Sequence, residues 1–190
     1  MIRSFIALPL PVRIAADLEA LRAPVPEARW VAPQNLHLTL AFLGEQHPHA
    51  LEDADLALSA IRAPVLELRL EGVGLFGGDK PTALYAALAE NPDLRRLQAK
   101  VERALRQAGV KFESRNFTPH VTVAWLGRKA PRHRLISWLE GFALHRSPAF
   151  AVEEFALYRS EMGTGGSVYE AMREYPLGES ALASGSAEEN

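Results

Sequence analysis

Apolar and polar residues alternate in two distant stretches of the chain that carry almost the same eight-residue phrase. The first is His37-Leu-Thr-Leu-Ala-Phe-Leu-Gly44 and the second is His120-Val-Thr-Val-Ala-Trp-Leu-Gly127. Five positions are identical, and the other three exchange one apolar residue for another. A period of two is typical of a strand with one buried face. The pattern therefore predicts two related strands, in which His and Thr share one face and Leu or Val points to the other.

The periodicity of the remaining chain predicts further strands and helices. Apolar alternation predicts strands near residues 3–8, 65–70, 82–89, 149–159 and 167–177, besides motif strands ending at Gly44 and spanning about 117–126. Apolar residues spaced by three and four predict helices near 12–21, 50–62, 92–108 and 132–140. The glycines between 72 and 78 predict a flexible connection, and Gly163-Thr-Gly-Gly166 predicts a hairpin turn.

The order of these elements is close to one module written twice. In each half, a helix, a motif strand and a second helix are followed by two strands. Duplicated modules tend to pack about a pseudo-twofold axis, which would turn both motif strands toward one shared cleft. We therefore expect an α+β fold with two pseudo-symmetric lobes of antiparallel sheet, flanking helices and a central cleft.

Length and composition indicate one ordinary domain. The chain has 190 residues, of which 48% are hydrophobic, enough for a core that is stable on its own. Residues 1–177 are expected to form a single bilobal domain. Residues 178–190 are rich in Gly, Ser, Ala and Glu and are expected to be a disordered tail. The apolar run at the N-terminus is interrupted by Pro9 and Pro11. It is therefore too short for the apolar region of a signal peptide or for a membrane span, so we expect a cytoplasmic protein.

Charge and cysteine content narrow the chemistry. The formal net charge of −2 provides no global basic field for nucleic acid, so RNA affinity would have to come from a local site. The absence of cysteine excludes disulfides, thiolate nucleophiles and thiolate metal ligands.

The repeated His and Thr are the candidate catalytic groups. In a strand, His37 and Thr39 lie about 6.6 Å apart along one face, as do His120 and Thr122, close enough for both to touch one phosphate. Two histidines with pKa values near 6.5 can supply a neutral base and a protonated acid at the same pH. In-line displacement at phosphorus needs that pair, and the hydroxyls of Thr39 and Thr122 can donate to the non-bridging oxygens.

Other interpretations of the same residues are weaker. A single His in an apolar strand is usually structural, but a structural His gives no reason for a Thr at the same offset in both copies. His-x-Thr is not a metal-ligand spacing, and neither motif contains a carboxylate. No serine lies on a Gly-x-Ser-x-Gly turn, which argues against a Ser-His-Asp triad. We expect neither a metal nor a cofactor.

The paired motif resembles that of the 2H phosphoesterases, and within them the RNA 2',3'-cyclic phosphodiesterases long called 2'-5' RNA ligases. The signatures are Asn35-Leu-His37 through Gly44 and Phe117-Thr-Pro-His120-Val-Thr122-Val. The segments Arg3-Ser-Phe5-Ile-Ala-Leu8, Gly74-Leu-Phe-Gly77 and Leu157-Tyr-Arg-Ser160 through Tyr169 are similar too. The resemblance covers roughly residues 2 to 177.

The resemblance implies a two-lobed fold and hydrolysis of an RNA terminal 2',3'-cyclic phosphate to a 2'-phosphate, with O3' leaving. It implies that His37 is the acid at O3', that His120 is the base, and that Thr39 and Thr122 hold the phosphate. Reversal would join RNA ends through a 2'-5' bond without ATP. The expected partner is RNA with a 2',3'-cyclic phosphate end, tRNA fragments among the candidates, and we expect a monomer that binds no membrane.

One position departs from the family pattern. Relatives often carry an Arg where this chain has Trp125, and the nearest arginine is Arg128. Arg128 is therefore a candidate for the anion contact, beside the alternative that it is a solvated loop charge. Strand alternation predicts that Trp125 and its counterpart Phe42 point away from the histidines and pack in the core.

Other functions remain open at this point. A 2H enzyme can act on another small substrate, such as ADP-ribose 1'',2''-cyclic phosphate or a 2'-5' oligoadenylate, because neither motif reads a base. A module that binds RNA ends or a partner without turnover is the alternative outside catalysis. Intact His and Thr in both copies argue against it.

Overall fold

The computed structural model describes residues 1–114, 116–163 and 166–178, and the predicted tail lies outside them from residue 179 onward. The strands are β1 (Ile2–Pro9), β2 (Ala28–Trp30), β3 (His37–Gln46), β4 (Leu66–Leu68), β5 (Leu70–Phe76), β6 (Ala83–Leu88), β7 (His120–Leu126), β8 (Phe150–Val152), β9 (Glu154–Gly163) and β10 (Gly166–Pro176). The helices are α1 (Val12–Leu18), α2 (Pro48–Ser59), α3 (Pro92–Gln107) and α4 (Arg132–Phe142), with 3-10 turns η1 (Glu19–Leu21) and η2 (Pro33–Asn35).

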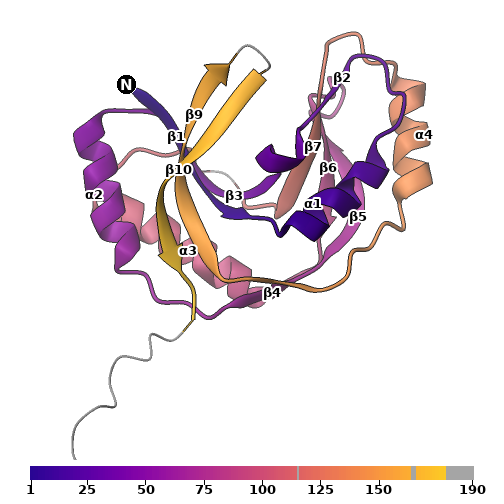
Figure 1. The fold of residues 1–190 in the computed structure, drawn as a ribbon. Helices are drawn as coiled ribbons and strands as arrows, with labels where there is room; N and C mark the ends of the chain where they lie inside the picture. The colour runs from indigo at the N-terminus through magenta and orange to yellow at the C-terminus, as the bar shows by residue number, and fades with distance from the viewer. Residues whose placement is uncertain (115, 164–165, 179–190) are drawn as a thin grey trace, which may run out of the picture.

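The two motif strands meet at the centre of one antiparallel sheet. Its order is β10-β9-β1-β3-β7-β6-β5, and the short strand β2 pairs with the end of β7, beyond the point where β3 pairs with it. β3 and β7 pair at Leu38 and Val121, the residues that directly follow the two histidines. Around this junction β1 corresponds to β6 and β9 to β5, so the predicted α+β fold with two related lobes is confirmed (Figure 1).

A single apolar core runs behind both lobes. Helices α2 and α3 pack together beside the β1–β3 lobe, and α4 packs against β5 of the other lobe (Figure 1). Leu38 and Val121 are fully buried in the same cluster as the apolar sides of these helices. The face that carries the alternate residues of β3 and β7 is left half-exposed.

Helix α3 begins and ends where its sequence predicts. The side chain of Asn91 accepts a hydrogen bond of 2.9 Å from the backbone of Leu94, and Gly109 ends the helix with a φ of 71°. Arg95 and Arg96 on its polar face form ion pairs with Glu90 and with Asp93, as expected for a solvated face. The helix predicted near residues 12–21 is α1 followed by η1; its first residue, Val12, is exposed, and Ile14 is buried in the core.

Two predicted strands are each divided between two sheets. The predicted strand 65–70 separates at Arg69 into β4 and the start of β5, and the predicted strand 149–159 separates at Glu153 into β8 and β9. β4 pairs with β8 in a small sheet of their own, while β5 and β9 continue in the main sheet. The apolar pattern of each segment predicts one continuous strand, so the sequence does not show where the strand changes its pairing partner.

The first part of the glycine-rich segment that predicted a connection lies in strand β5, whereas Gly77 and Gly78 form the turn after it. The pairing of β5 with β6 is interrupted by a bulge between Leu70 and Val73, where Gly72 has a φ of 81°. Pairing with β6 therefore overrides the low strand propensity of glycine. Gly163 pairs with Gly166 where β9 meets β10, and residues 164 and 165 of the predicted hairpin turn lie outside the described residues.

Candidate active site

The structure brings His37, Thr39, His120 and Thr122 together on one face of the sheet. Leu38 lies opposite Val121, and both point into the core. Continuing this register by one residue in each direction sets His37 opposite Thr122 and Thr39 opposite His120. Side chains directly opposite each other in an antiparallel pair are neighbours, with Cβ atoms about 4.5 to 5.5 Å apart. Each imidazole therefore lies beside the hydroxyl of the other copy.

Both imidazoles are held in the same way. The Nδ1 of His37 is 2.7 Å from the carbonyl oxygen of Asn35, and the Nδ1 of His120 is 2.6 Å from that of Thr118. A carbonyl oxygen can only accept, so each Nδ1 carries the proton. This leaves each Nε2 free to take up or release a proton. Two matched proton-transfer groups thus occupy one site.

Aromatic rings enclose each imidazole on both sides of the junction. The ring of His37 lies 4.7 Å from Phe5 and 5.2 Å from Tyr169, measured between centroids. The ring of His120 lies 4.6 Å from Phe76 and 5.5 Å from Tyr85. None of these four residues had a predicted role at the site, although three of them lie in the segments that resemble the family. They come from four different strands, and only the fold brings them beside the motifs.

Glycine at position 74 makes room for one of these rings. A Cβ at this position would fall below normal contact distance from the phenol ring of Tyr85, which lies across from Gly74 in the β5–β6 pairing. Tyr85 stacks on Phe76, and both contact His120. A side chain at position 74 would therefore displace the ring beside His120.

Burial lowers the pKa of both histidines. For His37, desolvation is the main cause, opposed by its hydrogen bond to Asn35 and assisted by the charge of His120. For His120, desolvation lowers the pKa and the hydrogen bond to Thr118 opposes it. Proximity to a second ionisable imidazole is expected to lower the pKa of each histidine further, because two positive charges in one site repel each other. In the free protein the neutral forms are favoured.

The two threonine hydroxyls are available to a ligand. Thr39 and Thr122 are half-buried on the histidine face. Neither hydroxyl forms a hydrogen bond with residues 1–114, 116–163 or 166–178. With the Nε2 atoms they provide donors on both strands, an arrangement suited to an oxyanion such as phosphate.

The prediction that Phe42 and Trp125 pack in the core is wrong. In each motif strand the pairing register shifts just after the threonine, so that Leu40 and Val123 are extra residues in a bulge. Two consecutive residues then point into the core, and the alternation is reversed beyond them. Phe42 and Trp125 consequently fall on the histidine face.

Arg128 lies in an exposed turn after β7. It forms no hydrogen bond or ion pair with the described residues, and its anion-binding role stays a prediction. Among those same residues, no three His, Asp or Glu side chains lie close enough together to hold a metal ion. No helix in the described part of the chain is both long and apolar enough to cross a bilayer.

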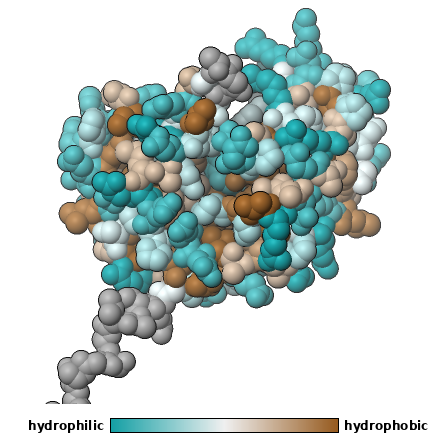
Figure 2. All heavy atoms as spheres, viewed as in Figure 1, coloured by the Kyte–Doolittle hydropathy of each residue, from teal (hydrophilic) through white to brown (hydrophobic). Residues whose placement is uncertain are grey.

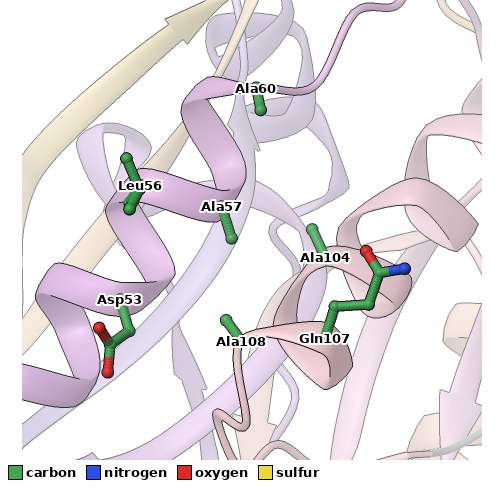
Figure 3. A pocket seen from close by; sticks show the side chains of 7 residues that line it. All are labelled: Asp53, Leu56, Ala57, Ala60, Ala104, Gln107 and Ala108. Atoms are coloured by element: carbon green, nitrogen blue, oxygen red, sulfur yellow. The ribbon is translucent and has the colours of Figure 1, made fainter.

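A surface groove lies apart from the histidine pair. It lies between α2 and α3 and is lined mainly by alanines, with Asp53 and Gln107 as its polar residues (Figure 3). It has no imidazole or hydroxyl group for acid–base chemistry. On the face drawn in Figure 2, hydrophilic residues predominate and apolar residues are scattered among them.

Comparison with known proteins gives a consistent result. Residues 10–164 match the family model of the 2'-5' RNA ligase superfamily. The chain is 35% identical over 187 residues to the RNA 2',3'-cyclic phosphodiesterase of Thermus thermophilus, covering 92% of this chain and 90% of that protein. It is 30% identical over 179 residues to the Escherichia coli protein of the same name, covering 92% and 96%.

Solved structures agree in fold. The crystal structure of TT0787 from Thermus thermophilus superposes with a TM-score of 0.75 at 30% identity, covering 92% of this chain and 97% of that chain. The structure of Escherichia coli LigT complexed with 3'-AMP superposes with a TM-score of 0.75 at 28% identity, covering 94% and 99%.

Proposed function

This chain belongs to the 2'-5' RNA ligase superfamily, and we propose that it hydrolyses the terminal 2',3'-cyclic phosphate of RNA by acid–base catalysis with two histidines. One observation carries the proposal. On adjacent strands, two imidazoles are fixed by backbone carbonyls at Nδ1, and each has a free Nε2 beside the hydroxyl of the other motif.

The proposed reaction is an in-line displacement at phosphorus. The Nε2 of His120 takes a proton from a water molecule as its oxygen attacks. The P–O3' bond breaks, the Nε2 of His37 gives its proton to O3', and the product carries a 2'-phosphate. Thr39 and Thr122 donate hydrogen bonds to the non-bridging oxygens, where negative charge concentrates. No step requires a metal ion, and the reverse reaction would form a 2'-5' bond.

Substrate binding supplies the protonation state that the acid needs. In the free protein, burial lowers both histidine pKa values. A cyclic phosphodiester carries one negative charge, and an opposite charge within a few ångströms favours imidazolium. The bound substrate therefore raises the pKa values again, so that one histidine is charged in the complex at neutral pH.

RNA ends are the proposed substrates, with cleaved tRNAs as one source. The names of the curated relatives, and the 3'-AMP bound to LigT, support a terminal nucleotide as the ligand. We further propose that the protein is a monomeric cytoplasmic enzyme and that Arg128 contributes charge near the bound phosphate.

Turnover of a nucleoside 2',3'-cyclic phosphate tests the proposal. We expect hydrolysis that survives excess EDTA and gives the 2'-phosphate as the main product by phosphorus NMR. His37→Ala and His120→Ala should each abolish most turnover, while His49→Ala, an exposed histidine on α2, serves as the matched control. Loss of activity in EDTA with rescue by a metal would contradict the mechanism, and a dominant 3'-phosphate would contradict the regiochemistry.

A further inference from the structure

Trp125 is a large aromatic side chain that stays open to solvent on the histidine face. It is 47% exposed, although β7 is otherwise mostly buried or half-buried. The bulge at Val123 places it on the same side of the sheet as His120 and Thr122. We propose that the indole of Trp125 stacks on the nucleobase of the terminal nucleoside and so determines preference for nucleoside substrates. This inference rests on the proposed function and adds a substrate-specificity residue to it.

The equivalent residue of the first motif shows that exposure is particular to Trp125. Phe42 occupies the same position in the repeat, but it is half-buried and the guanidinium of Arg3 lies 5.1 Å from its ring centroid. Within the described ranges no ring stacks on Trp125 and no cation covers it. The fold therefore covers one aromatic ring and leaves the other free for a ligand.

The position of Trp125 suits the length of one nucleoside. It lies three residues beyond Thr122, which is at most about 10 Å along the strand, and the bulge shortens that distance. A cyclic phosphate held by Thr122 and His120 carries its base on the far side of the ribose. A ring at the position of Trp125 can meet that base while the phosphate stays between the histidines.

The neighbours of Trp125 across the sheet leave space on one side and add charge on the other. On β6 it pairs with Ala83, whose methyl group is too small to cover an indole. On β2 it pairs with Arg29, so the two side chains share a face. Arg29 is exposed and forms no ion pair within the described residues. A cation there can meet the phosphodiester on the 5' side of the terminal nucleoside.

Stacking predicts a particular kind of specificity. Every nucleobase has a π-face, so stacking on an aromatic side chain distinguishes a base from no base more than it distinguishes among bases. The protein should therefore prefer nucleoside cyclic phosphates to a base-free cyclic phosphate, with little difference between adenosine and cytidine. An Arg at this position would instead contribute a positive charge, which attracts the phosphate rather than the base.

A comparison of two substrates tests the role of Trp125. Wild type, Trp125→Ala and Trp125→Phe are assayed with adenosine 2',3'-cyclic phosphate and with glycerol 1,2-cyclic phosphate, which has no base. In Trp125→Ala the ratio of kcat/KM for the nucleoside over the base-free substrate should fall by about 5- to 150-fold, mainly through KM. Trp125→Phe should retain much of the wild-type ratio. Leu144→Ala, which changes an exposed side chain elsewhere, should leave the ratio unchanged.

Indole fluorescence provides a second readout that needs no turnover. Adenosine 2'-phosphate should quench the emission of the wild type, and the quenching should disappear in Trp125→Phe, which keeps Trp30 and the buried Trp138. An unchanged substrate ratio in Trp125→Ala, or quenching that persists in Trp125→Phe, would overturn this inference and leave the proposed function standing. If the wild type turns over neither substrate, the proposed function fails, and the quenching still decides whether the indole stacks on a base.

Discussion

At the scale of single residues, the site is a matched set of proton and hydrogen-bond donors. Each histidine is bonded at Nδ1 to the carbonyl two residues before it, so both present Nε2 to the same space. The repetition of His-x-Thr predicted that these four side chains share one face of the sheet, and their catalytic and binding roles stay a prediction. Their aromatic neighbours could not be predicted, because Phe5 and Tyr169, for example, lie far apart in the sequence and meet only through the pairing of β1 with β9 and of β9 with β10.

Removal of a threonine hydroxyl should reduce the stabilisation of the transition state. Thr39→Ala and Thr122→Ala should each lower kcat/KM by about 5- to 150-fold, because a lost donor costs about 1 to 3 kcal/mol. Serine at either position keeps the hydroxyl and should retain most activity. Steady-state kinetics check this, with Thr82→Ala as the control, since the hydroxyl of Thr82 points to the carbonyl of Phe76. Wild-type rates in both alanine variants would contradict a role in holding phosphate.

At the scale of elements, the sequence predicted the helices and the motif strands, but not the points at which a strand leaves one sheet and joins another. Helix α3 follows its Asn91 cap and Gly109 stop because those signals are local. The strand breaks at Arg69 and Glu153 depend on the separate pairing of β4 with β8, which no local signal marks. The bulges after the two threonines had a weak signal, since four apolar residues in succession follow Thr in each motif and end the strict alternation. A bulge forms there only when the neighbouring strand pairs in that register.

Two glycines should respond to alanine with opposite signs. Gly141 lies in the last turn of α4, and Gly109 follows the end of α3 with a φ of 71°. A Cβ on either would meet nothing within 4 Å. Gly141→Ala should raise the free energy of unfolding by about 0.5 to 1 kcal/mol through helix propensity. Gly109→Ala should lower it by about 1 kcal/mol, because an L side chain is strained in that conformation.

Urea unfolding of both variants measures these changes. Since an added Cβ has no steric conflict at either site, a difference in the sign of the change in free energy of unfolding reports on backbone conformation alone. Changes of the same sign would show that the ends of α3 and α4 are not as described.

At the scale of the whole molecule, the site depends on how two lobes join. The single core behind the sheet holds β3 and β7 together, and the paired Leu38 and Val121 fix the register that brings the imidazoles near each other. The repeat predicted that the two motif strands would come together at one site. It could not predict that both lobes form one continuous sheet, because adjacency of β3 and β7 follows from packing between halves. The domain boundary at residue 177 stays a prediction.

Global stability should fall on mild acidification because of the same histidines. Their pKa values are lowered in the folded protein, so below about 6.5 the unfolded chain binds more protons. The free energy of unfolding should therefore decrease as the pH falls from about 6.5 through the lowered pKa values, and then level off. Urea unfolding of the wild type and of a His37→Gln/His120→Gln variant between about pH 7 and 5 measures the effect.

The double variant should lose less stability than the wild type over this range. Part of the dependence should remain, because burial also lowers the pKa of His145. The same pH dependence in both proteins would show that the site histidines are not desolvated in the folded state.

The most direct test of paired-histidine catalysis is the pH dependence of kcat/KM on a nucleoside 2',3'-cyclic phosphate for the wild type, His37→Ala and His120→Ala. The wild-type profile should be bell-shaped with its maximum below about 6.5, because the free protein holds both pKa values low. Each variant should lose about 10²- to 10⁴-fold in rate, His37→Ala losing the alkaline limb and His120→Ala the acid limb. A variant with near wild-type turnover, or a wild-type profile with only one limb, would contradict the two-histidine mechanism.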